Sequence, residues 1–199
     1  FDAITTSFAT IATGGFSPHQ ASIAAYQSIP IEAVIILFMI LSGIHFGLLF
    51  EAVRGKPSDL WRSPVVRFYL GFIALATAAA SWSTWQGGIY ESLPEAFRYG
   101  LFQVASIGTS TGFASANSAV WPSLAQFMLL FLTLQCACAG STSGGIKVDR
   151  ILVFLKTALV KLKEIKHPRG VFSVKLAGEA IEEKAVTQSV VYIVFYLLI

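Results

Sequence analysis

Charged side chains are scarce in this chain. They make up 13% of its 199 residues, against 55% hydrophobic residues and a mean hydropathy of +0.68. A soluble domain carries roughly 25% charged residues, so this composition argues against one. The net charge is +3, but most basic residues lie beside apolar stretches rather than in a patch with interleaved aromatic residues, so nothing indicates a nucleic-acid partner. The composition predicts a protein whose main solvent is membrane lipid.

Cysteine is almost absent as well. Cys136 and Cys138 are separated by one residue, which disfavours a disulfide between them, and a metal site there would lack further ligands. We interpret both as small residues of the apolar interior and expect no cofactor. The chain opens without a methionine or a basic leader, and the apolar run of residues 186–199 is shorter than the roughly 20 residues that cross a bilayer. We therefore expect an internal piece of a longer protein.

Long apolar runs are the main positive feature. Residues 31–53 and 65–85 are each predicted to span the membrane, and the second run ends at an interfacial pair of Trp82 and Trp85. Residues 92–106 are too short to cross. Ser92 and Glu95 have the spacing of a capping box, so a helix is predicted to start at this point.

The third run is apolar from residue 124 to residue 139 and resumes at Ile146 after an interruption. Non-helical backbone at membrane depth is tolerated only where protein buries it or where it lines water. The interruption is therefore a candidate functional loop. It consists of Gly140, Ser141, Thr142, Ser143, Gly144 and Gly145.

Basic residues predict the orientation. They flank the loop of residues 54–64 and follow the third run between residues 156 and 184, so both regions should be cytoplasmic. Residues 167–184 are polar enough for a cytoplasmic excursion, with a short hairpin expected at residues 171–176. Arg98 is the only basic residue between Trp82 and Pro122, which places that segment on the outer side.

Two short Thr-Gly segments occupy corresponding places in the chain. Placing Gly14 on Gly112 gives an offset of 98 residues, and each segment then follows a short helix and precedes a long span. The expected unit is a span, a half-helix, an extended segment and a second span. Residues 1–53 would end one unit, residues 65–166 would form a complete unit with a broken inner span, and residues 185–199 would begin the next. The two segments are Ala12-Thr13-Gly14-Gly15-Phe16 and Ser110-Thr111-Gly112-Phe113-Ala114.

Such a unit suits cation conduction. Rings of backbone carbonyls can replace the water around a potassium ion, and glycine permits the dihedral angles that this requires. A half-helix directs its partially negative C-terminal end toward the ion. A single segment is equally well explained as a surface turn, but two copies between spans favour a filter. The candidate ion-binding residues, with potassium as the substrate, are Ala12, Thr13, Gly14, Gly15, Ser110, Thr111 and Gly112.

The chain resembles the TrkH/KtrB/HKT superfamily of potassium transporters, and its TrkH branch most. The resemblance rests on residues 7–17, 42–47 and 102–113, and most specifically on Cys138-Ala139-Gly140-Ser141-Thr142-Ser143-Gly144-Gly145-Ile146-Lys147-Val148. It implies an all-α integral membrane protein with four pore units in a pseudo-fourfold arrangement around one pore. This chain would hold most of the second unit, the whole third and the start of the fourth.

The resemblance also implies a function: potassium uptake across the bacterial inner membrane, with residues 140–145 as an intramembrane gate beneath the filter. It implies a homodimer with one pore per subunit and a cytosolic nucleotide-binding partner of the TrkA type. Lys147 and Arg150 flank the gate, where they would either couple it to that partner or anchor the inner interface. A sodium-permeable transporter of the same fold is the alternative within the family.

Nucleotide binding and proteolysis fit the sequence less well. Residues 140–147 approach a phosphate-binding loop, but Lys147 comes one residue late and no Ser or Thr follows it. An intramembrane protease would need Ser141 or Ser143 beside His45. We expect no enzyme, because His45 is better explained as a polar residue bonded between helices.

Two outer residues complete the expectations. Arg98 should face away from the ion path, toward the headgroups or Glu95, because an exposed arginine would repel cations. His19 should lie in the outer vestibule, just after the first Thr-Gly segment.

Overall fold

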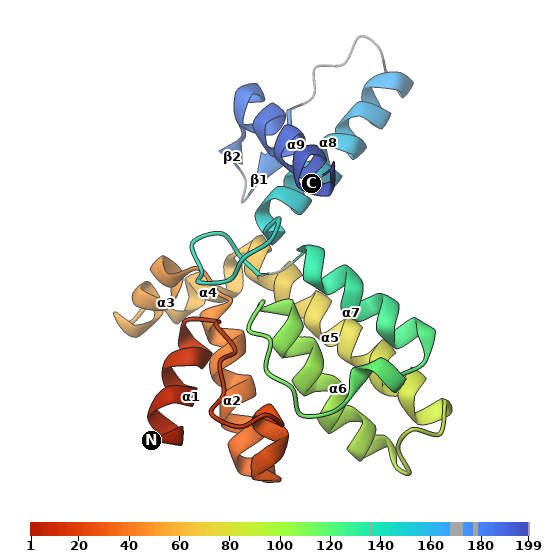
Figure 1. The fold of residues 1–199 in the computed structure, drawn as a ribbon. Helices are drawn as coiled ribbons and strands as arrows, with labels where there is room; N and C mark the ends of the chain where they lie inside the picture. Colours follow the sequence, from red (N-terminus) through yellow and green to blue (C-terminus); the bar gives the residue numbers. More distant parts are fainter. Residues whose placement is uncertain (136, 168–172, 177–178, 199) are drawn as a thin grey trace.

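The computed structural model describes residues 1–135, 137–167, 173–176 and 179–198. The fold of these residues is helical, with one short hairpin (Figure 1). The elements are α1 (Asp2–Ile11), η1 (Ser22–Tyr26), α2 (Ile29–Ser42), α3 (Phe46–Val53), α4 (Pro57–Arg62), α5 (Pro64–Gln86), α6 (Leu93–Gly108), η2 (Ser118–Val120), α7 (Ser123–Gln135), α8 (Val148–Lys166), β1 (Lys175–Leu176), β2 (Glu179–Ala180) and α9 (Glu183–Leu198).

The helices form two successive units with the same order of elements. In the first, α1 leads through an extended segment and η1 to α2 and then α3. In the second, α6 leads through an extended segment and η2 to α7, a loop and α8. Figure 1 shows α1 beside α2 and α5 to α7 packed together, while α8 and α9 project from this body. The predicted repeat is therefore visible in the order of the elements.

Local sequence accounts for the helix starts of the second unit. The Ser63 Oγ accepts a hydrogen bond from Val66 N at 3.4 Å, and the Ser92 Oγ accepts one from Glu95 N at 3.4 Å. Proline occupies the first turn of both helices, where its missing N–H costs nothing. The helix predicted to begin at Ser92 is confirmed as α6.

The first predicted span is not one straight helix. α2 ends at Ser42, and α3 leaves at an angle of 108°. Three carbonyls at the end of α2 have partners outside the helix. Ile40 O accepts from the Tyr69 hydroxyl, Ser42 O accepts from the Thr142 hydroxyl, and Gly43 O accepts from Cys138 N. These partners satisfy groups that a helix end otherwise leaves orphaned, so the bend is stabilised by residues distant in sequence.

The bend gives a test of the Tyr69 contact. A Cβ on Gly43 would overlap the Tyr69 hydroxyl, which donates to Ile40 O at 3.2 Å. Tyr69→Phe should lower the free energy of unfolding by about 0.6–1 kcal/mol, the size of one interhelical hydrogen bond in a membrane protein. Thermal unfolding of the full-length protein in detergent measures this change. The same substitution at the exposed Tyr196 is the control, and an equal effect at both positions would contradict the assignment.

Other boundaries differ slightly from prediction. The helix formed by the third run ends at Gln135 rather than at Ala139, and the next helix begins at Val148 rather than at Ile146. The hairpin pairs Lys175 with Ala180, so it lies later than expected, and the predicted residues 171 and 172 fall outside the described residues.

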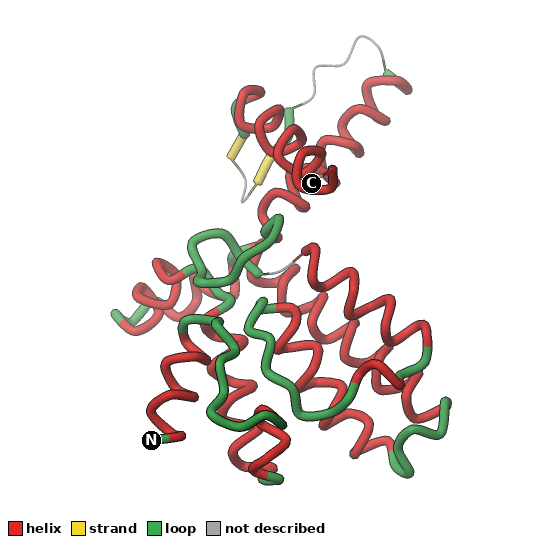
Figure 2. The backbone as a smooth tube through the Cα atoms, viewed as in Figure 1, coloured by secondary structure: helices red, strands yellow, loops and turns green. Residues whose placement is uncertain are grey.

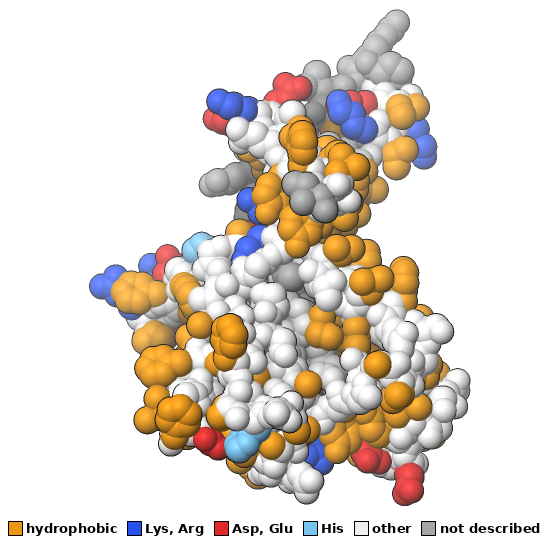
Figure 3. Space-filling view, in the orientation of Figure 1, with side chains coloured by type: hydrophobic (Ala, Val, Ile, Leu, Met, Phe, Trp, Pro, Cys, Tyr) orange, Lys and Arg blue, Asp and Glu red, His pale blue; other side chains and the backbone are white. Residues whose placement is uncertain are grey.

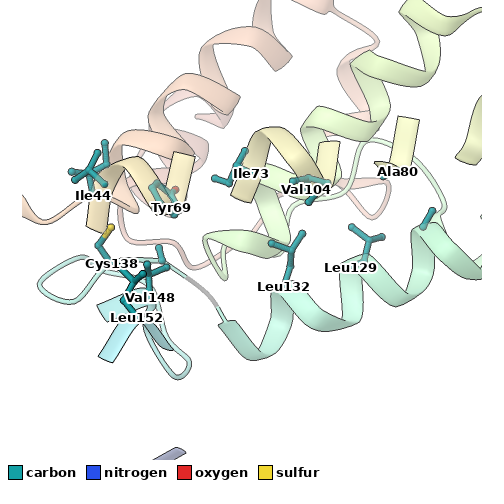
Figure 4. Packing of buried hydrophobic residues seen from close by; sticks show 14 of the residues in the cluster. Ile44, Tyr69, Ile73, Ala80, Val104, Leu129, Leu132, Cys138, Val148 and Leu152 are labelled. Atoms are coloured by element: carbon teal, nitrogen blue, oxygen red, sulfur yellow. The ribbon is translucent and has the colours of Figure 1, made fainter. Parts of the chain in front are cut away.

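Two apolar clusters hold the body together. The larger joins α5, α6 and α7 through residues such as Ile73, Val104 and Leu132, and it includes Ile44 and Cys138 beside the bend (Figure 4). The smaller lies between the units and consists of Ala9, Ile23, Ile35, Met39, Phe102, Ala105 and Phe113. Apolar burial of this kind is the main favourable term that holds the second half-helix against the first unit.

The surface is also largely apolar. Among the described residues, α5 is long and apolar enough to cross a membrane, and the bent α2–α3 pair would make a second crossing. Figure 3 shows apolar side chains over the projecting α8 and α9 and few charged groups on the central body of the face shown. Exposed apolar residues such as Phe127, Leu130 and Leu159 need lipid or another helix to cover them.

Candidate ion pathway

Both half-helices end in the same backbone motif. After α1, Thr13 N donates to Thr10 O and Gly14 N donates to Ala9 O, at 3.1 and 2.8 Å. Residue Thr13 has φ 49°, so the chain turns through the left-handed region. This hydrogen-bond pattern is a Schellman motif, which normally places glycine where Thr13 stands.

The second half-helix repeats the motif in detail. After α6, Ser110 N donates to Ile107 O at 2.9 Å and Thr111 N donates to Ser106 O at 2.8 Å. Ser110 has φ 56°. A non-glycine residue in this region costs about 1–2 kcal/mol, and strain of that kind is characteristic of functional sites.

The two motifs correct the predicted register. Thr13 corresponds to Ser110, and Gly15, with φ 66°, corresponds to Gly112, with φ 86°. The structural offset is therefore 97 residues rather than 98, which pairs Gly14 with Thr111. The left-handed positions are Thr13 and Gly15 in the first segment, so Gly14 does not need the conformational freedom that we expected it to use. The sequence-based prediction matched the Thr-Gly pairs of the two segments, whereas in the structure Gly15-Phe16 corresponds to Gly112-Phe113.

Buried hydroxyls hold the second segment in place. The Ser106 Oγ donates to Phe113 O at 2.6 Å, and the Thr109 and Thr111 hydroxyls lie 2.7 Å apart. Gln103 extends the attachment through a 2.6 Å bond to Ala116 O. These contacts fasten the extended segment to the side of α6, so its backbone follows any movement of that helix.

The two Thr-Gly segments touch each other. A Cβ on Gly15 would overlap the carbonyl oxygen of Thr111, whereas a Cβ on Gly112 would meet nothing within 4 Å. At the end of the second segment, Ala114 N donates to the Ser22 Oγ at 3.2 Å and Ala24 N donates to Ala114 O at 3.1 Å. Figure 2 shows these two loops running side by side between the helices. The structure thus brings the predicted filter residues of both units together, with Gly112 bordering open space.

The interruption of the third span forms a loop, here named the broken-span loop, residues 137–147. Its base is closed by backbone bonds from Ile146 N to Leu134 O and from Val148 N to Ala137 O. The bend after α2 holds it as well, because Cys138 N donates to Gly43 O and Phe46 N donates to Gly140 O, at 3.0 and 3.1 Å. The loop of the second unit therefore rests in the bend of the first.

The tip of the broken-span loop contacts the end of α1 and the start of the second Thr-Gly segment. The Thr142 hydroxyl lies 2.9 Å from Ile11 O, the last carbonyl of α1, and 3.4 Å from Ser42 O. Gly144 N donates to the Ser110 Oγ at 2.8 Å. Figure 1 shows the loop lying over the ends of α1 and α6. The loop predicted as a gate thus contacts Ser110, one of the predicted filter residues.

Charged residues flank the exit from the loop. Lys147, at φ 74°, donates through Nζ to the Ser143 carbonyl and lies 3.2 Å from the Ser143 Oγ. Arg150 donates to Ile146 O at 3.1 Å and places its guanidinium 4.0 Å from the centre of the Tyr192 ring on α9. Both residues therefore contact the loop or its end, and Arg150 also links it to the next helix.

The residues that an intramembrane protease would need are engaged elsewhere. The Ser141 Oγ donates to Cys138 O at 2.6 Å, and the His45 Nδ1 accepts from Gly47 N at 3.0 Å at the start of α3. His45 packs on the loop, because a Cβ on Gly140 would overlap its ring. Within the described residues, no group of three or more His, Cys, Asp or Glu side chains could hold a metal ion.

Sequence reasoning missed the partner of Arg98. Its guanidinium binds Glu32 rather than Glu95, with Nε–Oε2 and Nη2–Oε1 distances of 2.6 and 2.7 Å. The signal that could have identified this pair is a carboxylate and an arginine in otherwise apolar segments. His19 is exposed, and its Nε2 lies 2.7 Å from the Asp2 carboxylate at the start of α1.

Paired half-helices that end in strained, touching segments above a broken span are features of an all-α membrane transporter of the pore-loop class. The chain belongs to the TrkH family of cation transport proteins, whose family model matches residues 1–199. A pseudo-fourfold arrangement of pore units fits this family.

Named relatives agree with this assignment. The chain is 38% identical over 185 residues to the Trk system potassium uptake protein TrkH of Salmonella typhimurium, covering 92% of this chain and 38% of that protein. It is 31% identical to the Trk system potassium uptake protein TrkG of Escherichia coli over 92% of this chain and 38% of that one. The crystal structure of the potassium transporter TrkH from Vibrio parahaemolyticus matches with a TM-score of 0.93 and 36% identity, covering 99% of this chain and 43% of that one. The chain thus spans about two-fifths of the length of these relatives.

Proposed function

We propose that this chain supplies two filter segments and the gating loop of a potassium-uptake pathway in the bacterial inner membrane. The observation that carries the proposal is the broken-span loop, whose Thr142 bonds to Ile11 O just before the first Thr-Gly segment and whose Gly144 bonds to Ser110 at the start of the second. The names of the relatives, Trk system potassium uptake proteins, support potassium as the ion.

The filter would use backbone oxygen. Both segments follow half-helices whose C-terminal ends carry partial negative charge, which favours a cation beside them. The left-handed backbone at Thr13, Gly15, Ser110 and Gly112 would direct carbonyl groups toward a dehydrated ion without adding a full negative charge. The remaining segments of the filter would come from the rest of the full-length protein.

The gate would be the broken-span loop. Its hydrogen bonds to Ile11 O at the end of α1 and to the Ser110 Oγ support a position beside the proposed filter, where the loop would restrict the passage of ions. Lys147 holds the loop through Ser143, and Arg150 joins the loop to α9. A movement of α8 or α9 would therefore reach the loop through these two residues.

The regulatory input would come from a partner. We infer a homodimer in which each subunit carries its own pore and binds a cytosolic nucleotide-binding subunit of the TrkA type. The naming of the relatives as parts of a Trk system supports a multicomponent assembly. The relatives are also named as uptake proteins rather than enzymes, which supports transport rather than catalysis as the activity.

The experiment that tests the filter is cation uptake by the full-length protein with Gly112→Ser. Gly112 has φ 86° and borders open space, so serine would strain the backbone without a steric clash. The preference for potassium over sodium should fall by about tenfold, because about 1.4 kcal/mol of lost discrimination is a factor of ten. Uptake of both ions into proteoliposomes measures the ratio.

The matched control is Gly71→Ser on α5, where an added Cβ also meets nothing within 4 Å and the backbone is helical. Its ratio should equal that of the wild type. An unchanged ratio in Gly112→Ser would contradict the filter assignment, and a wild type that prefers sodium would favour the sodium-permeable transporter of the same fold.

A further inference from the structure

A charged pair crosses the boundary between the two units. The Arg98 guanidinium binds the Glu32 carboxylate through two nitrogens, at 2.6 and 2.7 Å. The side chain of Glu32 is 4% exposed and that of Arg98 is 26% exposed. A fork-shaped guanidinium that binds both oxygens of a carboxylate fixes orientation as well as distance.

The pair lies beside the apolar cluster that joins the units. Glu32 is in the first turn of α2, one turn before the buried Ile35, and Arg98 is one turn before the buried Phe102 of α6. The Arg98 guanidinium also lies over the Tyr99 ring, 5.0 Å from its centre. The pair therefore connects α2 of the first unit directly to the half-helix that carries the second Thr-Gly segment.

Stability alone is a weak reason for such a pair. Removing two charges from water costs about as much as their attraction returns, and apolar replacements of similar volume are often neutral or stabilising. The hydrophobic effect, in contrast, is non-directional and does not by itself select an orientation of one side chain toward another. The specific contribution of a two-pronged ion pair is that it selects one rotation and one axial position of α6.

The position of α6 determines the position of the proposed second filter segment. The helix runs without a break from Arg98 to Gly108, about 15 Å at 1.5 Å per residue, and then enters the Schellman motif at Ser110. The bond from the Ser106 Oγ to Phe113 O carries the rest of the segment with the helix. A shift at Arg98 would thus displace the backbone oxygens of Thr111 and Gly112.

We propose that Glu32 and Arg98 are positioning residues that fix α6 and thereby set the preference of the second filter segment for potassium over sodium. The inference rests on the proposed function. It adds a specificity device outside the filter, in a contact between the two units.

The test is a charge-reversal cycle in the full-length protein, read as the ratio of potassium to sodium uptake in proteoliposomes. Glu32→Gln and Arg98→Gln should each lower the ratio about fivefold, a coupling of the usual size for residues in contact. Reversing the pair, with Glu32→Arg and Arg98→Glu together, should restore the ratio to within about twofold. Arg98→Lys keeps the charge but cannot bind both oxygens of the Glu32 carboxylate, so the ratio should still fall at least about twofold.

A control and a second readout separate positioning from general damage. Lys161→Gln removes one partner of an exposed pair on α8 and should leave the ratio unchanged. Because the ratio is independent of the amount of folded protein, a merely structural loss would lower both uptake rates together. If the single Gln variants do not fold, Arg98→Lys and the reversed pair still decide the test. The proposal would be overturned if these two variants had the same ratio of potassium to sodium uptake.

A failure of the proposed function can be distinguished from a failure of this inference. A wild-type ratio near one would refute the proposed function and this inference with it. A potassium-selective wild type whose ratio is unchanged in the Gln variants, or a folded reversed pair that restores nothing, would overturn the inference alone.

Discussion

Gly15→Ala is expected to lower potassium uptake by the full-length protein by at least about tenfold. Gly15 has φ 66°, and an added Cβ would overlap the backbone oxygen of Thr111 on the other segment. The left-handed conformation costs about 1–2 kcal/mol at alanine, and the overlapping atom is backbone that cannot rotate away. The two segments would have to separate, so uptake should fall by at least about tenfold. Potassium uptake by proteoliposomes with matched protein content measures this loss.

Two further alanine substitutions divide that effect into its causes. Gly112→Ala shares the backbone strain, at φ 86°, but lacks the overlap, so it should retain more uptake than Gly15→Ala. Gly71→Ala on α5 has neither problem and should match the wild type. Equal losses at Gly15 and Gly112 would show that strain alone matters and would contradict the direct contact between the segments.

Deleting residues 140–145 is expected to increase flux about tenfold or more, as would follow from losing about 1.4 kcal/mol of barrier. The deletion is geometrically mild, because backbone bonds from Ile146 to Leu134 and from Val148 to Ala137 already close the base of the loop. It removes Thr142, which bonds to the last carbonyl of α1, and Gly144, which bonds to Ser110 of the second Thr-Gly segment. Uptake rates at saturating potassium give the comparison, and a deletion with unchanged or lower flux would refute a restrictive gate.

A point substitution tests the same gate at full loop length. Thr142→Val removes the hydroxyl that reaches Ile11 O and Ser42 O but keeps nearly the same shape. Losing one net hydrogen bond of about 1 kcal/mol should raise flux about fivefold. Thr157→Val on α8 is the matched control, because the Thr157 hydroxyl bonds to Val153 O of its own helix, at 2.7 Å. Equal changes in both variants would show that the loop contact does not restrict flux.

The sequence by itself determined the elements whose signals are local. Ser92 caps α6, a proline lies in the first turn of that helix, and glycine and hydroxyl residues interrupt the third run. The Thr-Gly segments and the loop were also recognisable, because a filter and a non-helical break both need short runs of unusual composition. Periodicity and composition act within a few residues, so they predict where helices start and where they cannot continue.

Only the tertiary structure decided how these parts fit. The register of the repeat, with Thr13 opposite Ser110, depends on backbone dihedrals that the Thr-Gly letters do not encode. The bend after Ser42 depends on Tyr69, Cys138 and Thr142, which lie far away along the chain and satisfy its carbonyls. Glu32 and Arg98 are 66 residues apart in the sequence. The physical reason is common to all three: a polar group in an apolar setting must find a partner, and which partner it finds depends on the packing of the helices rather than on its neighbours in the chain.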